Sequence, residues 1–180
     1  MSGATDSERI IKNQFEVLKR IDTYIGATNT KCTIIMSYCA AATAFILAIL
    51  DKLDLAGASM QLMVAVGLFS VLALAFSLWC MVLAALIIFP ITFGKPNTLS
   101  GESLIFYGDI ASCKTSEEYS NKVLKKTNDD FLEDLNGQIY TLATIASGKF
   151  SRIQFATIIL MIHFGCVTAV LIGAAIFHLC

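Results

Sequence analysis

Charged residues and prolines are scarce in this chain of 180 residues. Asp, Glu, Lys and Arg make up 15% of it, hydrophobic residues make up 56%, and there are only two prolines. A soluble domain usually contains about 25% charged residues, so the composition argues against a soluble domain and favours a membrane protein. Because proline disrupts the helical turn before it, its near absence leaves long segments free to form uninterrupted helices.

Three segments contain no charged residue at all. They cover residues 32–50, 55–94 and 153–180. A membrane-spanning helix needs about 20 apolar residues, so each segment is long enough to cross a bilayer once. We therefore expect spans at 32–50, 59–90 and 153–178. The second segment is longer than one crossing needs, which leaves a re-entrant pair of helices as an alternative.

Basic residues are nearly absent from one side of the predicted membrane. Five precede the first span and seven lie between the second and the third, so 12 of the 13 share a side and only Lys52 does not. Cytoplasmic loops carry an excess of Lys and Arg. The sequence therefore predicts a membrane protein with a cytoplasmic N-terminus, a cytoplasmic 94–152 segment and an outward-facing C-terminus. The DKLDLAG turn (51–57) also faces out, and no signal peptide is expected.

Recognisable catalytic and metal-binding motifs are also missing. There is no CxxC pair, GxSxG, HExxH or Walker motif, and the six cysteines are expected to behave as small apolar residues. His163 and His178 are too isolated to be metal ligands, and His163 is interpreted as a residue that hydrogen-bonds between helices. The acidic group DDFLED (129–134) is interpreted as a solvated helix start favoured by the helix dipole. No enzymatic activity, metal or cofactor is expected, and no nucleic-acid partner.

Two amphipathic stripes lie outside the predicted spans. Apolar residues at spacings of three and four mark one helical face in residues 7–31 and another in 128–152. The stripes consist of Ile11, Phe15, Leu18, Ile21 and Ile25, and of Phe131, Leu135, Ile139, Leu142, Ile145 and Phe150. Because neither stripe is stable against water, we expect the two helices to pack together. Asp6 or Ser7 is expected to cap the first helix and Asn128 the second.

A shorter helix is predicted between the second and third spans. Thr115 and Glu118 form a capping-box pattern, and Lys125 and Lys126 suit the end of a helix. The stretch SLIFYGDI (103–110) before it is expected to be extended or irregular. The predicted fold class is an all-α membrane protein, one domain over residues 1–180. It has about three transmembrane helices and a cytosolic helical stalk formed by residues 1–31 and the 94–152 segment.

Small residues gather on two of the predicted spans. They are Ala40, Ala41, Ala44 and Ala48 in the first span, and Gly165, Ala169, Gly173 and Ala174 in the third. Small faces allow membrane helices to approach closely, so we expect a homo-oligomer in the lipid bilayer. The spans carry His163 as an ionisable residue at membrane depth, which does not predict a selective pathway through one copy. A pore formed by several copies stays open.

The polar part of the chain contains groups suited to a small aromatic ligand. Phe106 and Tyr107 offer flat faces for stacking a base, and Asp109 can accept hydrogen bonds from it. Amide groups and cations that could hold the rest of a nucleotide are Asn29, Gln138, Lys31, Lys114, Lys149 and Arg152. The alternative is that Phe106 and Tyr107 fill the apolar seam of the stalk.

Three blocks carry a resemblance to a known family. They are RIDTYIGATNTKCTIIMSY (20–38), SLIFYGDIASCKTSEEY (103–119) and LEDLNGQIYTLATIASGKF (132–150). In this order, with hydrophobic helices between the first two and after the third, they resemble the Pycsar transmembrane effector domain of bacterial antiphage defence. The similarity extends from about residue 8 to residue 171.

The resemblance implies a ligand and a partner. A neighbouring pyrimidine cyclase would make cyclic CMP or cyclic UMP after phage infection, and the effector would sense it and impair the inner membrane, causing abortive infection. The blocks and the chemistry above give these candidate ligand-binding residues: Lys31, Phe106, Tyr107, Asp109, Tyr119, Gln138, Lys149 and Arg152. The alternative is a constitutive helical membrane protein, such as a holin-like toxin or a membrane scaffold, that senses no nucleotide.

Overall fold

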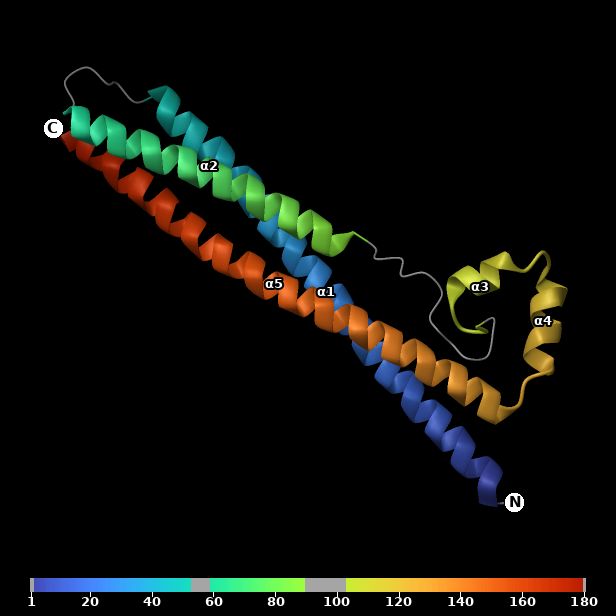
Figure 1. Cartoon of the computed structure of the whole chain (residues 1–180). Helices are drawn as coiled ribbons and strands as arrows, with labels where there is room; N and C mark the ends of the chain where they lie inside the picture. Colours follow the sequence, from blue (N-terminus) through green and yellow to red (C-terminus); the bar gives the residue numbers. More distant parts are fainter. Residues whose placement is uncertain (1, 53–58, 90–102, 180) are drawn as a thin grey trace. The chain divides into compact units, whose positions relative to one another are not determined.

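The computed structural model describes residues 2–52, 59–89 and 103–179, with side chains between residues 6 and 176, and within these ranges α-helix is the regular secondary structure that it forms. Its helices (Figure 1) are α1 (Ser2–Lys52), α2 (Met60–Ile88), α3 (Tyr107–Ser112), α4 (Ser116–Leu124) and α5 (Asn128–Leu179). The helices α1, α2 and α5 are each long and apolar enough to cross a membrane. The predicted fold class is confirmed, and α2 is one unbroken helix, which excludes the re-entrant pair.

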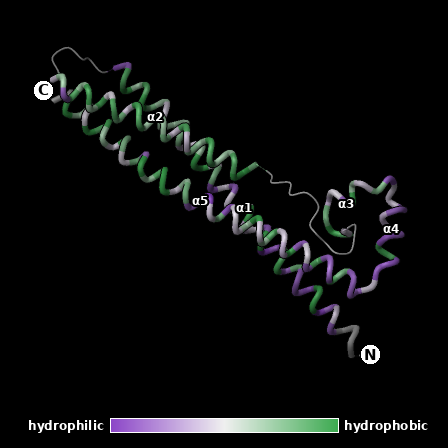
Figure 2. Tube along the Cα trace, viewed as in Figure 1, coloured by the Kyte–Doolittle hydropathy of each residue, from purple (hydrophilic) through white to green (hydrophobic). Residues whose placement is uncertain are grey.

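The chain divides into two compact units. The first comprises Met1–Gly26 and Ile91–Gly148, and the second comprises Ala27–Pro90 and Lys149–Cys180. The helices α1 and α5 contribute residues to both units, α2 belongs to the second, and α3 and α4 belong to the first. Hydrophobic residues dominate the helices of the second unit, whereas hydrophilic residues are frequent in the first (Figure 2). This difference follows the charge-free segments of the sequence.

In the second unit, α2 lies alongside α1 and α5 (Figure 1) and buries one narrow face. The buried residues of α2 are Val66, Ser70, Ala73, Ser77, Cys80, Ala84 and Ile87. They alternate at spacings of four and three, a 3.5-residue repeat that keeps one helix face against its neighbours as in a coiled coil. Close approach is visible at Gly173 of α5, where an added Cβ would lie 2.5 Å from the Val66 side chain.

Few polar side chains enter this bundle. Ser77 donates to the Cys39 carbonyl at 3.0 Å and shares a hydrogen bond of 2.8 Å with Thr43. His163 is fully buried, but neither ring nitrogen has a hydrogen-bond partner, so the predicted hydrogen bond between helices is wrong. Its ring instead packs against the edge of Tyr38, with centroids 5.7 Å apart. Of the cysteines, four are buried as predicted, namely Cys32, Cys39, Cys80 and Cys166.

The first unit joins the two amphipathic stripes. The rings of Phe15 on α1 and Phe131 on α5 lie 6.1 Å apart, and Leu135 is completely buried. The predicted packing of the N-terminal helix with the helix after residue 127 is therefore confirmed. The segment at residues 26–31 is part of the same continuous α1 helix.

Two of the predicted helix caps are wrong. The helix α1 already begins at Ser2, so Asp6 and Ser7 lie inside it. At the start of α5 the capping residue is Thr127 rather than Asn128. The Thr127 hydroxyl accepts from the Asp130 amide at 3.2 Å, and the Asp130 carboxylate accepts from the Thr127 amide at 2.9 Å. The reason is spacing, since a capping box needs its two members three residues apart.

The cap of α4 is confirmed, with one difference. The Thr115 hydroxyl accepts from the Glu118 amide at 3.2 Å, and the Glu118 carboxylate accepts from the Lys114 amide at 2.9 Å, one residue before the cap. Within SLIFYGDI only residues 103–106 are non-helical, because α3 begins at Tyr107. The predicted turn at 53–57, the helix end at Pro90 and the start of the 94–152 segment up to residue 102 lie outside the described residues.

Candidate functional site

The non-helical stretch before α3 is held by its own side chains. The Ser103 hydroxyl accepts from the amides of Ile105 and Phe106, at 3.1 and 2.9 Å. The carboxylate of Asp109, in the first turn of α3, accepts from the Ser103 amide at 2.9 Å. Ser and Asp side chains commonly stabilise turns by bonding to nearby backbone groups. Asp109, predicted to face a ligand, therefore already has a structural role in shaping this stretch.

Side chains from α4 and α5 hold the same stretch from outside. Gln138 donates to the Ser103 hydroxyl at 3.1 Å, and the Asp134 carboxylate accepts from the Leu104 amide at 2.7 Å. The Tyr119 hydroxyl donates to the Leu104 carbonyl at 3.0 Å. Asp134 and Gln138 are four residues apart, so they project from the same face of α5. We call this network the Ser103 clasp; its members are Ser103, Leu104, Asp109, Tyr119, Asp134 and Gln138.

One hydrogen-bonding position in the clasp is unused. Oδ2 of Asp134 accepts from Leu104, whereas Oδ1 is buried without a partner, and the whole residue is only 8% exposed. Leaving a buried acceptor unsatisfied costs about 1–3 kcal/mol, and more for a charged group. Such groups are rare in native proteins and mark positions where a further donor fits. The acidic group at 129–134 is therefore not uniformly solvated as predicted, because its last member points into the unit.

The two aromatic candidates differ in their surroundings. The rings of Phe106 and Tyr107 lie 4.8 Å apart at 50°. Phe106 is half-buried over Gly108, where an added Cβ would lie 2.6 Å from its ring. Tyr107 is 69% exposed. Phe106 therefore has a packing role, as in the alternative interpretation, whereas Tyr107 keeps a face available for stacking.

The three cationic candidates belong to the second unit. Lys149 is buried, and its ammonium donates to the Asn29 side chain at 2.9 Å and to the Ile87 carbonyl. Ile87 is in the last turn of α2, where backbone carbonyls lack helical partners, so Lys149 closes the end of that helix. Burial lowers the pKa of Lys149, Cys32 opposes this shift, and the Arg152 guanidinium adds to it. Lys31 and Arg152 are exposed.

The geometry of the clasp is that of a binding site or a structural network. Among the described residues, no group of three or more His, Cys, Asp or Glu side chains could hold a metal ion. A family model described as the Pycsar effector protein domain matches residues 13–177. The chain belongs to the Pycsar effector family. No curated protein and no solved structure matches it.

Membership agrees with the architecture of the chain. Pycsar effectors act in antiphage defence without enzymatic activity, and the three apolar helices of this one indicate a multi-pass membrane effector. The first unit of this Pycsar effector brings Asp109, Tyr119 and Gln138 together around Ser103 and Leu104. Lys31, Lys149 and Arg152 lie in the other unit.

Sequence reasoning missed three members of the clasp in this Pycsar effector, namely Ser103, Asp134 and Leu104, which takes part through its backbone. Ser103 lies four residues before the start of α3, and serine side chains often close turns of this kind. Asp134 was grouped with its acidic neighbours. Its position beside Leu135, a member of the apolar stripe, is the signal that places it next to the buried face rather than in solvent.

Proposed function

We propose that this membrane effector senses a cyclic pyrimidine nucleotide, cyclic CMP or cyclic UMP, and then impairs the bacterial inner membrane so that an infected cell stops growing before phage matures. The unpartnered buried oxygen of Asp134 in the Ser103 clasp is the observation that carries the proposal. Family membership and three helices long enough to span a membrane support it.

The clasp and Tyr107, the first residue of α3, together supply the chemistry that a small pyrimidine ring requires. The exposed face of Tyr107 stacks on the base, and Oδ1 of Asp134 accepts a hydrogen bond from an exocyclic amino group or a ribose hydroxyl. Both side chains belong to the first unit. The amide of Gln138, one turn after Asp134, donates to the Ser103 hydroxyl and so helps to hold the stretch before α3. A ring of this size offers few contacts, so each of them carries a large share of the affinity.

The partners follow from this role. A pyrimidine cyclase encoded nearby supplies the nucleotide, and the effector lies in the inner membrane with its N-terminus and its polar first unit in the cytoplasm. Several copies assemble in the bilayer.

Calorimetry of the purified full chain in detergent tests the proposal. Wild type is expected to bind cyclic CMP or cyclic UMP. Loss of a stacking aromatic costs about 1–3 kcal/mol per base, so Tyr107→Ala is expected to weaken binding roughly 5- to 150-fold. The matched control is Tyr140→Ala, which removes another exposed tyrosine from the same unit outside the clasp. Equal affinities for the two variants would contradict the assignment of Tyr107.

A second variant tests the unused oxygen. Asp134→Asn keeps an amide oxygen for the Leu104 amide but replaces the free acceptor by an NH₂ group, which repels a ligand donor. We expect a folded protein with at least tenfold weaker binding, since each 1.4 kcal/mol is a factor of ten. Asp109→Ala and Lys149→Ala are also expected to abolish the response to cyclic pyrimidine nucleotides. Both variants should in addition have a lower melting temperature than wild type, because both side chains hold backbone groups.

The alternative is a constitutive membrane protein in which the clasp is purely structural. It is favoured by one observation, that Asp109, Tyr119 and Gln138 already have partners within the unit. In that case wild type binds no cyclic nucleotide, and its expression harms cells that lack any cyclase.

A further inference from the structure

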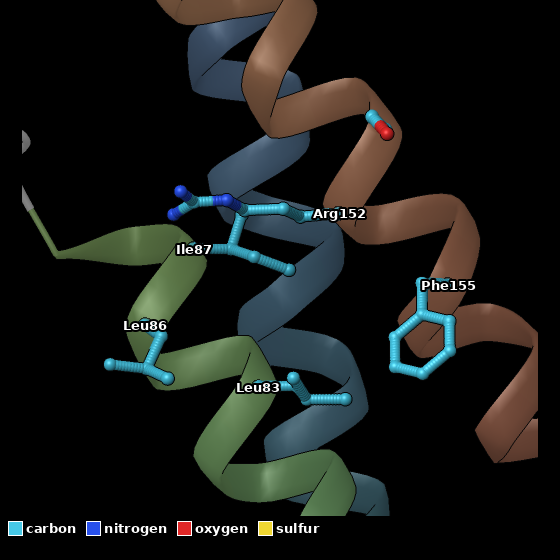
Figure 3. Close-up of a pocket in the computed structure, with 6 residues that line it drawn as sticks. Leu83, Leu86, Ile87, Arg152 and Phe155 are labelled. Carbon is cyan, nitrogen blue, oxygen red and sulfur yellow. The ribbon is translucent and has the colours of Figure 1, made fainter.

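A groove runs between the end of α2 and α5 in the second unit. Its volume is about 470 Å³, and six residues line it: Leu83, Leu86, Ile87, Ser151, Arg152 and Phe155 (Figure 3). The walls are apolar except for Ser151 and Arg152. Leu86 is 56% exposed and Phe155 49% exposed. An open groove with such walls is stable in a bilayer only when lipid fills it.

The groove has one charged end. The Arg152 side chain reaches across to Ile87 at the end of α2, whereas Leu83 and Phe155 lie farther along the two helices (Figure 3). Arg152 also immediately precedes the charge-free segment that begins at Ile153. The predicted spans therefore put the guanidinium at the membrane boundary and the apolar part of the groove within the membrane.

The positive charge of the Arg152 guanidinium needs an anionic partner. No carboxylate among the described residues forms an ion pair with Arg152. The nearby ammonium of Lys149 has the same sign as the Arg152 guanidinium and is already bonded to Asn29 and Ile87. Guanidinium groups bind phosphate through two parallel hydrogen bonds. Basic pockets between transmembrane helices on the cytoplasmic side are typical sites for anionic lipid headgroups.

We propose that this groove binds an anionic phospholipid, with the headgroup phosphate on Arg152 and an acyl chain along Leu83, Leu86 and Phe155. A lipid satisfies both parts of the groove at once. The phosphate of a free nucleotide would satisfy Arg152 but leave the apolar walls uncovered. Binding of this lipid does not depend on the nucleotide site proposed for the first unit.

Native mass spectrometry of the full chain in detergent tests the proposal with two added lipids, dioleoyl-phosphatidylglycerol and dioleoyl-phosphatidylcholine. Wild type is expected to retain the anionic lipid preferentially. A basic residue at an anionic surface contributes enough that its loss weakens binding about fivefold, which is the expected effect of Arg152→Gln. Arg152→Lys keeps the charge and is expected to retain most of the binding.

The matched control is Lys52→Gln. Lys52 is an exposed cation of the same unit in the last turn of α1 and does not line the groove, so its loss is expected to leave lipid retention unchanged. Leu86→Trp fills the groove but leaves Arg152 in place, and the exposed position of Leu86 can accept the larger side chain. This variant is therefore also expected to retain less phosphatidylglycerol.

Three outcomes would overturn the proposal. The first is equal loss in Arg152→Gln and Lys52→Gln, which would show attraction by net charge alone. The second is equal retention of the two lipids by wild type. The third is displacement of phosphatidylglycerol by cyclic CMP or by inorganic phosphate, which would assign Arg152 to a soluble phosphate ligand. Melting temperatures of all variants identify any loss of lipid retention that comes from unfolding. If Arg152→Gln is destabilised, lipid retention by Arg152→Lys shows whether the positive charge is required.

Discussion

Two buried charged residues outside the predicted spans, Lys149 and Asp134, have different surroundings. The ammonium of Lys149 donates to the Asn29 side chain and to a helix-terminal carbonyl. One oxygen of Asp134 has a partner and the other has none. Burying a charge is costly unless it is paired and hydrogen-bonded. Lys149 is therefore explained by the closure of α2, while Asp134 requires something further, which we propose is the ligand.

Because of Lys149, the stability of the folded chain is expected to vary with pH in the alkaline range. Its pKa is lowered from 10.5 in the folded chain, so between the lowered value and 10.5 the unfolded chain binds more protons than the folded one. Stability rises with pH wherever the unfolded state binds more protons. Thermal unfolding in detergent is expected to show this rise as pH approaches 10.5, and Lys149→Met is expected to lack it. Lys114→Met, at an exposed lysine, serves as the control and should keep the wild-type slope.

At the scale of the elements, the N-terminal caps of α4 and α5 organise the first unit. The box of Thr127 and Asp130 begins α5, and the pair of Thr115 and Glu118 begins α4. Between them the two helices deliver Tyr119, Asp134 and Gln138 to one short stretch before α3. Changes at the caps are therefore expected to loosen the clasp as well as the helices.

Thr127→Ala is expected to reduce the stability of the first unit by about 1 kcal/mol, the usual cost of losing an N-cap side chain. Thr127→Ser keeps a hydroxyl and should cost much less. Hydrogen exchange in the first turn of α5 measures both variants, and equal exchange in the two would contradict the role of the hydroxyl.

The same cap should weaken in acid. The Thr127 amide and then the Thr127 hydroxyl lower the pKa of Asp130 from 3.8. The carboxylate therefore stabilises the folded chain above 3.8, and this contribution is lost as pH falls through the lower folded value. Exchange in the first turn of α5 should rise over that range in wild type, and less in Asp130→Asn.

At the scale of the whole molecule, the two stripes of small residues are used differently. On α5, Gly173 and Ala174 are buried within the chain, and Gly173 packs on Val66 of α2. On α1, the alanine face stays exposed; it consists of Ala40, Ala41, Ala44 and Ala48. A free face of small residues suits close packing against another membrane helix, so we assign the contact between copies to α1.

Ala44→Leu is expected to lower the number of copies in the assembly, because the larger side chain prevents close approach on that face. Ala75→Leu makes the same change at an exposed alanine of α2 and is the control. Mass measurement of the detergent-solubilised protein, with and without cyclic nucleotide, compares them. A monomeric wild type under both conditions would rule out assembly.

Topology is the second prediction at this scale. With 12 of 13 basic residues on one side, reporter fusions are expected to place residue 115 in the cytoplasm and residue 180 outside. A cytoplasmic signal from residue 180 would contradict an odd number of crossings.

The sequence by itself determined the membrane class, the number of long helices and the family, because these depend on charge-free length and on local pattern. It also predicted the pairing of the two amphipathic stripes, since apolar faces must be covered. Which residues are buried within those helices depended on contacts between segments far apart in the chain. Only the tertiary structure showed that Lys149 closes the end of α2, that Asp109 shapes a turn and that Asp134 points inward with one oxygen unused. The physical reason is that a charged side chain looks solvated in sequence, and its burial is decided by partners 30 or more residues away.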